Sequence, residues 1–520
     1  MKSQKSLYRK WASRVMLLIA PMLILTACTK NFEEINTNPS GLKELTAPDL
    51  RSLFPGALVT GLGASYNETT MLLFAGVYSQ HFAGTNPAQE SHRYVIVQRW
   101  MDIWPGTYVS TMPKLVNIIE ATKGGKEPSM NAVARMWKVY AFMRLTDYFG
   151  PIPYSKIGKD TTVVNYDDQK SIYFDFFKEL DEATNDLKNN LAKPSFATKD
   201  LIYNGDNAKW LKFGNTLRLR LALRISDVEP AKAKLEAEKA FAGGVMTEVA
   251  DGAFFKTSAD FPHGLNNFMG RNGSRMSTSM ESLLVGYNDP RLPKLWSPAL
   301  SDGKFHGVRN GMSVAQQNMP QNSINSNSAV GPKYQPVNMN TTPQAVMYAS
   351  EAYFLRAEGA LNGWNMGGTA QSLYEKGIET SMREHEVTDA AAIANYINGT
   401  SLPIAPDNAF PTPALTDIPV KFASDPEKQR EQIGTQKWIA LFPESHEAWA
   451  SIRRSGYPKF YPLLNSQNPD IAPDMMIRRI SFLDREIIAN GVAVKAAVPL
   501  LGGGPDNVAT RLWWDKSKSK

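Results

Sequence analysis

Residues 131–154, NAVARMWKVYAFMRLTDYFGPIPY, form the stretch that decides the fold of this chain. Within it, large apolar side chains such as Met136 and Tyr140 recur every three or four residues, which is the spacing of one face of a helix. The pattern ends at Gly150 and the proline after it, because glycine ends helices readily and proline cannot continue one. The stretch therefore predicts a helix over residues 131–149 with a sharp stop.

Further helical patterns follow, and they come in pairs. Paired helices of this size are typical of tetratricopeptide repeats, in which one hairpin cannot bury its apolar face without a neighbouring hairpin. We therefore expect a mainly α fold, with a tetratricopeptide-like scaffold of about four helical hairpins lying within residues 50–245 and 344–390. The predicted pairs are residues 131–149 with 171–189, 207–225 with 230–242, 344–361 with 370–386, and 53–78 with 108–121.

Two long segments lack a helical pattern. Residues 251–342 are rich in Asn, Gly, Ser, Pro and Met, and residues 400–430 are rich in Pro. A segment without regular helices is uncommon at this length in a compact domain, and it is commonly functional. Because loops on a rigid scaffold carry many binding residues, we expect ligand contacts in this loop-rich second half.

The N-terminus has the pattern of an exported lipoprotein. Basic residues precede a short apolar run over residues 15–25, which is too short for a bilayer that needs ~20 residues. Cys28 stands just after this run and is the only cysteine in the chain. Lipid attachment explains a solitary cysteine in an exported protein, and the alternative is a buried free thiol. The predicted segments are a signal peptide (1–27), a lipidated Cys28, a polar tether (28–40) and one domain (28–520).

Charge gives little support to nucleic-acid binding. The predicted signal peptide carries five basic residues and no acid, so its removal lowers the formal net charge from +7 to +2. The sequence also lacks a basic stripe with interleaved aromatic residues, which would favour a nucleic-acid partner. After Cys28, no apolar stretch approaches the length of a membrane span, so we expect the lipid alone to hold the chain at a membrane.

Several segments together resemble the SusD/RagB family of outer-membrane nutrient-binding lipoproteins of the Bacteroidetes. The resemblance runs from Cys28 to the C-terminus, and it rests on the order and spacing of the segments as a set. They are residues 32–39 (FEEINTNP), 144–154 (RLTDYFGPIPY), 289–292 (DPRL), 353–358 (YFLRAE), 436–442 (QKWIALF), 447–449 (EAW), 453–458 (RRSGYP) and 511–515 (RLWWD).

The resemblance implies a SusD-like helical scaffold with a loop-rich second half. It also implies a lipid anchor at the outer membrane, where members of the family usually face outward and cap a SusC-like TonB-dependent barrel transporter. They pass oligosaccharides, or in some members other nutrients, to that barrel, and they are not enzymes. Peptide or protein binding is the alternative function, because concave tetratricopeptide surfaces commonly bind peptides or proteins.

Sugar binding needs flat aromatic rings for the C–H faces of a pyranose, together with polar groups that replace water on its hydroxyls. Residues 80–104 and 263–275 supply both kinds, and we expect them to converge in a shallow surface site. Trp296 and Trp364 are further candidates, since a Trp in a turn is hard to bury fully. The candidate ligand residues are His81, Asn86, Arg93, Trp100, Asn266, Asn267, Arg271, Trp296 and Trp364.

Structural roles compete with these assignments. Trp100 and Trp104 are four residues apart, so they also fit one apolar face of a helix. The polar density of residues 263–275 also fits plain solvent exposure. We interpret Arg453 and Arg454 as structural residues that pair with acids such as Glu444 or Glu447.

The sequence shows no arrangement that is typical of catalysis. Its histidines are scattered without an HExxH or HxH motif, and it contains no P-loop, no glycine-rich dinucleotide turn and no Gly-x-Ser-x-Gly elbow. Its acidic residues fall mostly on the predicted solvent faces of helices. We therefore expect a binding protein with no catalytic site, no metal site and no cofactor.

Overall fold

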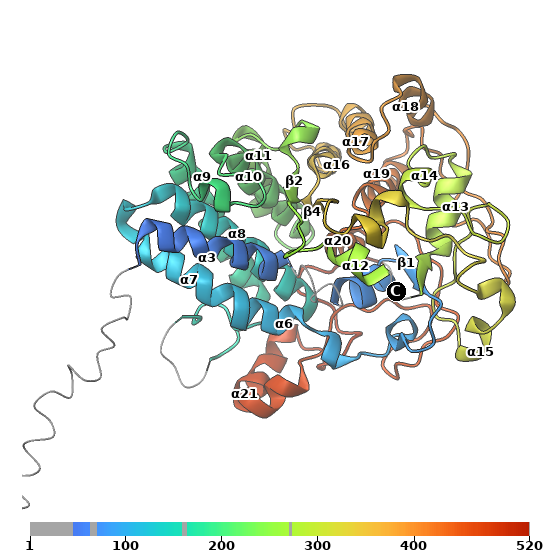
Figure 1. Cartoon of the computed structure of the whole chain (residues 1–520), viewed down its shortest axis with the longest axis horizontal. Coiled ribbons are helices and arrows are strands. Elements are labelled where there is room, and N and C mark those ends of the chain that lie inside the picture. The colour runs from blue at the N-terminus through green and yellow to red at the C-terminus, as the bar shows by residue number, and fades with distance from the viewer. Residues whose placement is uncertain (1–44, 63–69, 159–163, 270–272, 519–520) are drawn as a thin grey trace, which may run out of the picture. The chain divides into compact units, whose positions relative to one another are not determined.

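The computed structural model describes residues 45–62, 70–158, 164–269 and 273–518. The chain divides after Asp49 into two units, and the second, Leu50–Lys520, carries the elements of the fold. This second unit is mainly helical with short strands, which confirms the predicted fold class (Figure 1). The predicted lipidation site Cys28 and the candidate ligand residue Arg271 lie outside the described residues.

Three helical hairpins follow one another along the described chain. The helix α10 packs on α9, on α11 and on α16, so the hairpins form one continuous stack (Figure 1). This arrangement is what the paired helical patterns predicted, because each hairpin covers the apolar face of its neighbour. The hairpins are α8 (Pro128–Phe149) with α9 (Gln169–Lys188), α10 (Asn207–Arg224) with α11 (Pro230–Ala242), and α16 (Ala349–Leu361) with α17 (Ala370–Glu384).

The hairpin helices begin and end where the sequence provides caps. At the start of α9, the Asp168 carboxylate accepts a hydrogen bond from the Ser171 N–H at 2.9 Å. Asp206 accepts one from the Ala208 N–H at 3.0 Å at the start of α10. Such bonds satisfy donors that the first turn of a helix leaves unpaired. The helix α8 ends at Gly150, whose φ of 82° favours glycine.

The fourth predicted pair is more irregular than the sequence indicates. The helix α3 (Ala47–Leu62) ends early, and a π-helical turn (Met71–Ala75) with the short α5 (Gly76–Tyr78) follows after residues outside the description. Its predicted partner becomes a second π-helical turn (Gly106–Thr111) and α7 (Met112–Ala121). The side chains of Thr60 and Thr111 meet at 2.8 Å between the two parts.

Residues 251–342 contain more regular structure than predicted. Proline and glycine break this segment into pieces that are too short for a helical period to be recognised. Residues 344–347, which we expected to open a helix, form instead the strand β4, paired with β2 in an antiparallel sheet. The elements here are β2 (Ala253–Phe255), α12 (Gly264–Met269), β3 (Ser274–Met276), α13 (Thr278–Gly286), α14 (Leu292–Leu295), α15 (Val314–Gln317) and β4 (Gln344–Met347).

The other elements surround the hairpins. Between α18 and α19 the structure has neither helix nor strand, over residues 398–425. Two of these elements, α19 and α20, pack against each other, and α19 also packs on α16 and α17. The remaining elements are β1 (Phe82–Gly84), α6 (Ile103–Pro105), α18 (Ala390–Ile397), α19 (Pro426–Ala440), α20 (Ser445–Ser455) and α21 (Asp484–Ala497).

A buried network of charges joins the hairpins to α20. Arg220 of α10 donates two hydrogen bonds to the Glu351 carboxylate of α16, at 2.8 and 2.6 Å. One turn later, Arg224 donates to Asp147 of α8 at 2.8 Å and to Glu447 of α20 at 2.5 Å. Buried charges are costly unless they are paired, so this network favours one packing of these helices over others.

The C-terminal segment completes the same network. The indole N–H of Trp514 donates to the Asp147 carboxylate at 3.0 Å, and the Tyr173 hydroxyl donates to it at 2.6 Å. Trp514 is fully buried. Among the described residues, no helix combines the length and the hydropathy of a membrane span.

Candidate ligand-binding site

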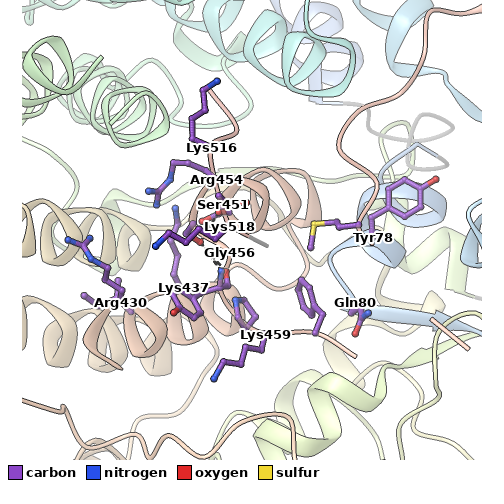
Figure 2. A pocket seen from close by; sticks show the side chains of 18 of the residues that line it. Tyr78, Gln80, Arg430, Lys437, Ser451, Arg454, Gly456, Lys459, Lys516 and Lys518 are labelled. Carbon is purple, nitrogen blue, oxygen red and sulfur yellow. Dashed lines mark hydrogen bonds between the residues drawn. The ribbon is translucent and has the colours of Figure 1, made fainter. Parts of the chain in front are cut away.

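An open cleft with a volume of about 880 Å³ lies along α19 and α20. Its walls come from these helices, from residues 456–462, from residues 473–476 and from residues 516–518 near the C-terminus. Figure 2 shows side chains from these separate segments around one opening. The volume lies within the ~300–1,000 Å³ that is usual for small-molecule sites.

Two glycines shape the wall beyond α20. Gly456 ends that helix with a φ of 79°, and its N–H donates to the Ile452 carbonyl at 2.7 Å. On α19, a Cβ at Gly434 would lie 2.6 Å from the Tyr457 Cβ. Real Cβ atoms do not approach that closely, so glycine at this position lets the loop after α20 lie directly against α19.

Aromatic side chains line the same wall. Tyr457 and Phe460 are partly exposed and both line the cleft. The Phe460 ring packs edge-on against the buried Trp438, with 6.1 Å between centroids. The Tyr457 hydroxyl donates to a Glu427 carboxylate oxygen at 2.5 Å. Both rings are therefore held in place while part of each ring stays accessible from the cleft.

Charged groups lie beside these rings. Arg454 of α20 pairs with Glu358 of α16, and both line the cleft. Burial alone would raise the pKa of Glu358, but the Arg454 charge and hydrogen bond outweigh burial and hold that pKa below its usual range. The side chain of Lys437 is only 4% exposed, with its Nζ 3.5 Å from a Glu447 oxygen. Burial lowers the pKa of Lys437, and the charge of Glu447 opposes that shift.

The predicted partners of the arginine pair need correction. Arg454 pairs with a carboxylate on α16, and Glu447 of its own helix pairs with Arg224 and with Lys437. Arg453 lies 3.5 Å from the centroid of the Trp449 ring and donates to the Asp147 carbonyl at 2.7 Å. Glu447 therefore pairs with cations of other helices, while Glu444 accepts from the Glu447 N–H at 2.9 Å and caps α20.

The two segments that we expected to converge do lie together. The strand β1, within residues 80–104, pairs with β3, within residues 263–275, and Ala83 faces Arg275. Just beyond the strands, the Thr85 N–H donates to the Gly273 carbonyl at 2.9 Å. Asn86 follows and is partly exposed, with its side chain accepting a hydrogen bond from the Ala88 N–H at 3.0 Å.

Four of the candidate ligand residues are buried, which contradicts the exposure that we expected of them. His81, Asn266 and Trp296 have exposed fractions of 0%, and that of Arg93 is 3%. The Trp296 ring packs against Phe442 at 5.0 Å between centroids and has no face open to a ligand. The ring is buried in the hydrophobic core, although Trp296 lies at the end of the short helix α14.

The buried polar candidates serve the backbone instead. Asn266 donates to the Lys333 and Gln335 carbonyls at 3.0 and 3.1 Å, and so holds α12 to a neighbouring loop. His81 lies between the Ser445 hydroxyl and the Trp438 carbonyl, at 3.1 and 3.0 Å. Burial lowers the pKa of His81 to about 3, so its ring is neutral at ordinary pH.

Asn86, Trp100, Asn267 and Trp364 are partly exposed, and a ligand role for them stays a prediction. Trp100 packs edge-on against Phe74 at 6.3 Å in a 3₁₀ turn, whereas Trp104 is buried in α6. The two rings therefore do not share one regular helix. Trp364 lies in the turn between α16 and α17.

None of the eight candidate residues that the structure describes lines the cleft. Gln80 and Tyr94 do line it, and both lie in the segment that the sequence marked. The signal that was missed is residues 453–458, where an aromatic residue follows the glycine that ends a helix. Within the described ranges, no group of three or more His, Cys, Asp or Glu side chains is placed to hold a metal ion.

Comparison with known proteins shows which family this chain is related to. A family model described as SusD-like, Susd and RagB outer membrane lipoprotein, matches residues 57–515. No curated protein is significantly similar to the chain. Among solved structures, a chitin-binding SusD homologue from Flavobacterium johnsoniae is 34% identical with a TM-score of 0.83, covering 90% of this chain and 99% of its own.

Two further solved structures are similar over the same extent. A SusD homologue from Bacteroides uniformis is 30% identical with a TM-score of 0.82, and covers 91% of this chain and 99% of its own. A SusD-like protein from Bacteroides thetaiotaomicron is 31% identical with a TM-score of 0.80, and covers 90% and 99% respectively. The similarity therefore extends over both the hairpins and the loop-rich segments.

Proposed function

Because this chain belongs to the SusD-like family of outer-membrane lipoproteins, we propose that it binds an extracellular oligosaccharide and delivers it to a SusC-like TonB-dependent transporter. A chitin-binding relative that is 34% identical over 90% of the chain supports a glycan as the ligand class. We further propose that a lipid on Cys28 anchors the protein at the outer membrane, facing outward.

The observation that carries this proposal is the make-up of the cleft. Tyr457 and Phe460 offer aromatic surface for the C–H faces of a sugar ring, and charged side chains beside them can bind its hydroxyls. A peptide-binding groove on helical repeats would instead present apolar pockets for side chains. The mixture of rings with Arg, Lys, Asp and Glu therefore favours a glycan over a peptide.

The open form of the cleft fits a carrier that must release its ligand. A site that is reached from solvent along its length leaves much of a sugar chain hydrated. We expect dissociation constants in the micromolar to millimolar range, about −8 to −4 kcal/mol. The ionisation of Glu358 also favours binding over hydrolysis. Arg454 lowers the pKa of this carboxyl group, so Glu358 is a carboxylate and has no proton to donate to a glycosidic oxygen.

A titration series tests the proposal. The chain with Cys28 replaced by alanine is titrated with a panel of oligosaccharides and with a matched panel of short peptides, and heats of binding are measured. Binding to at least one oligosaccharide, weakened by Tyr457→Ala, is the expected result. Binding to peptides alone would overturn the glycan assignment, and co-purification of a barrel transporter from membranes tests the delivery step separately.

A further inference from the structure

The cleft carries an excess of positive charge. Six basic residues line it against four acidic ones, and the basic residues come from α19, from α20, from the loop after α20 and from the C-terminal segment (Figure 2). They are Arg430, Lys437, Arg454, Lys459, Lys516 and Lys518. Separate segments thus bring more basic than acidic side chains to one space.

Pairing removes part of this excess, since Lys459 lies 3.0 Å from a Glu431 oxygen and both Lys437 and Arg454 have carboxylate partners. Glu358 is neutralised by Arg454 at the cleft wall. Lys437 has a carboxylate neighbour in Glu447, but that carboxylate also accepts from Arg224 at 2.5 Å. Arg224 also donates to Asp147 at 2.8 Å, so these two cations face two carboxylates and the charge of Lys437 is balanced. A buried ammonium in the wall of an open cleft is costly unless a ligand or water completes its hydrogen bonds.

An adjoining hollow carries two arginines whose charges are matched by those of Asp474 and Asp515. This hollow has a volume of about 340 Å³, shares Asp474 and Met475 with the cleft, and is also lined by Arg478 and Arg511. Both arginines contact one carboxylate, that of Asp515, at 3.2 and 2.7 Å. Asp515 is fully buried and lies behind the hollow, whose charged lining consists of Arg478, Arg511 and Asp474.

Two basic side chains of the cleft are available to a ligand. Arg430 is partly exposed and donates to the neutral Asn362 amide oxygen at 3.0 Å, and Lys516 is exposed. Neither has a carboxylate within 4 Å among the described residues. Charge-assisted hydrogen bonds to carboxylate or sulfate oxygens are about twice as strong as those to neutral hydroxyls, so such cations select for an anion.

We propose that the cleft takes an anionic saccharide, one whose sugar rings carry carboxylate or sulfate groups. The rings of Tyr457 and Phe460 would hold the sugar faces while Arg430, Lys516 and the floor at Lys437 bind the negative groups. This inference rests on the proposed glycan-binding function and names its ligand class. It differs from the neutral chitin that the Flavobacterium johnsoniae relative binds.

The test compares three tetrasaccharides of similar length in calorimetric titrations. One is a galacturonate oligomer with carboxylates, one is a chondroitin oligomer with sulfates, and one is neutral chitotetraose. We expect at least one anionic ligand to bind about tenfold more tightly than chitotetraose, and to weaken as salt rises from about 0.05 to 0.5 M. Tighter binding of the galacturonate or of the chondroitin oligomer identifies the carboxylate or the sulfate as the preferred group.

Matched variants place the effect in the cleft. The double variant Arg430→Gln with Lys516→Gln should weaken anionic binding about tenfold or more, weaken chitotetraose binding much less, and leave the melting temperature unchanged. The control Lys495→Gln removes an exposed charge on α21, outside the cleft, and should change none of these. Anionic binding that is insensitive to the double variant would overturn the inference.

The failure of the inference can be distinguished from the failure of the proposed function. Binding of chitotetraose with equal or weaker binding of both anionic ligands would overturn the anionic assignment and leave glycan binding intact. If none of the three saccharides binds while the variants and the parent melt at the same temperature, the inference falls and the glycan panel decides the function itself.

Discussion

Arg454 and Glu358 form a two-pronged ion pair, in which each terminal guanidinium nitrogen lies 2.6 Å from a different carboxylate oxygen. The pair joins α20 to α16 at the wall of the cleft. Both side chains are largely buried, with 6% and 12% exposed. The geometry is favourable for a planar guanidinium, which binds a carboxylate through two parallel hydrogen bonds.

Replacing Arg454 by methionine should destabilise the fold strongly. The change leaves the Glu358 carboxylate without its partner in a poorly hydrated place, and breaking such a pair typically costs ~3–5 kcal/mol. Urea unfolding of the parent and the variant measures the loss, and Lys421→Ala at an exposed position serves as the control. A loss below about 1 kcal/mol would show that the pair behaves like a surface ion pair.

The buried Glu384 should make stability depend on pH. Its carboxylate accepts hydrogen bonds from the Ala349 and Ser350 N–H groups at the start of α16, at 2.7 and 3.3 Å. Burial raises its pKa from 4.5 to about 7. The folded chain then binds the proton more tightly than the unfolded chain, so this contribution is fully present below pH 4.5 and is lost as pH rises through about 7.

Glu384→Gln measures that contribution. The amide mimics the protonated carboxyl, so the variant should lack this part of the pH dependence, which amounts to at most about 3 kcal/mol. Urea unfolding of both proteins at several pH values between 4.5 and 7 gives the difference in slope. Parallel stability curves for the two proteins would mean that Glu384 titrates normally.

Trp296→Ala should behave as a core truncation. The ring is fully buried between Phe82 and Phe442, and removing a buried Trp typically costs ~3–5 kcal/mol. Trp364→Ala, at a partly exposed turn position, should cost much less. Melting temperatures compare the two variants, and similar losses for both would contradict the assigned burial.

Truncating the rings in the cleft wall should weaken glycan binding without unfolding the protein. Tyr457→Ala or Phe460→Ala should each cost roughly 1–3 kcal/mol of binding, a range taken from stacking of aromatic rings on nucleic-acid bases. Titration with a bound oligosaccharide measures the loss, and Trp100→Ala tests the surface near β1 and β3 in the same way. An effect at Trp100 with none at Tyr457 or Phe460 would move the glycan site to that surface.

Cys28→Ala should release the protein from the membrane. Without the thiol, lipid attachment is impossible, and we expect the variant in the soluble periplasmic fraction. Fractionation followed by immunodetection checks this, and protease treatment of intact cells expressing the parent shows which way the protein faces. An unchanged membrane fraction for the variant would contradict anchoring by lipid.

The regular helices could be predicted from the sequence because local signals agree with packing. The helix predicted over residues 230–242 has those limits in the structure, and the one predicted over 207–225 ends one residue early. Pro230 opens the first, and Asp206 caps the second. Where a strand takes its hydrogen bonds from a distant partner, as β4 does from β2, no local pattern reveals it.

The candidate site could be predicted only in part, because burial depends on the whole fold. An Asn, His or Trp in a loop-rich segment has the same composition signal whether it binds a ligand or the backbone. In the structure, the side chains of Asn266 and His81 hydrogen-bond to backbone carbonyls, and the Trp296 ring packs against other aromatic rings. The convergence of the segments around β1 and β3 was predicted, but the cleft needs residues 516–518 beside α19, and sequence spacing does not bring these together.

The hydrogen bond from Trp514 to Asp147 joins residues that lie 367 positions apart. A polypeptide emerges N-terminus first, so α8 and α10 are available long before the last residues arrive. Until then, the Asp147 oxygen lacks its indole donor and accepts only from the Tyr173 hydroxyl, at 2.6 Å. Copies that end before Trp514 would therefore lack the indole that closes this part of the core.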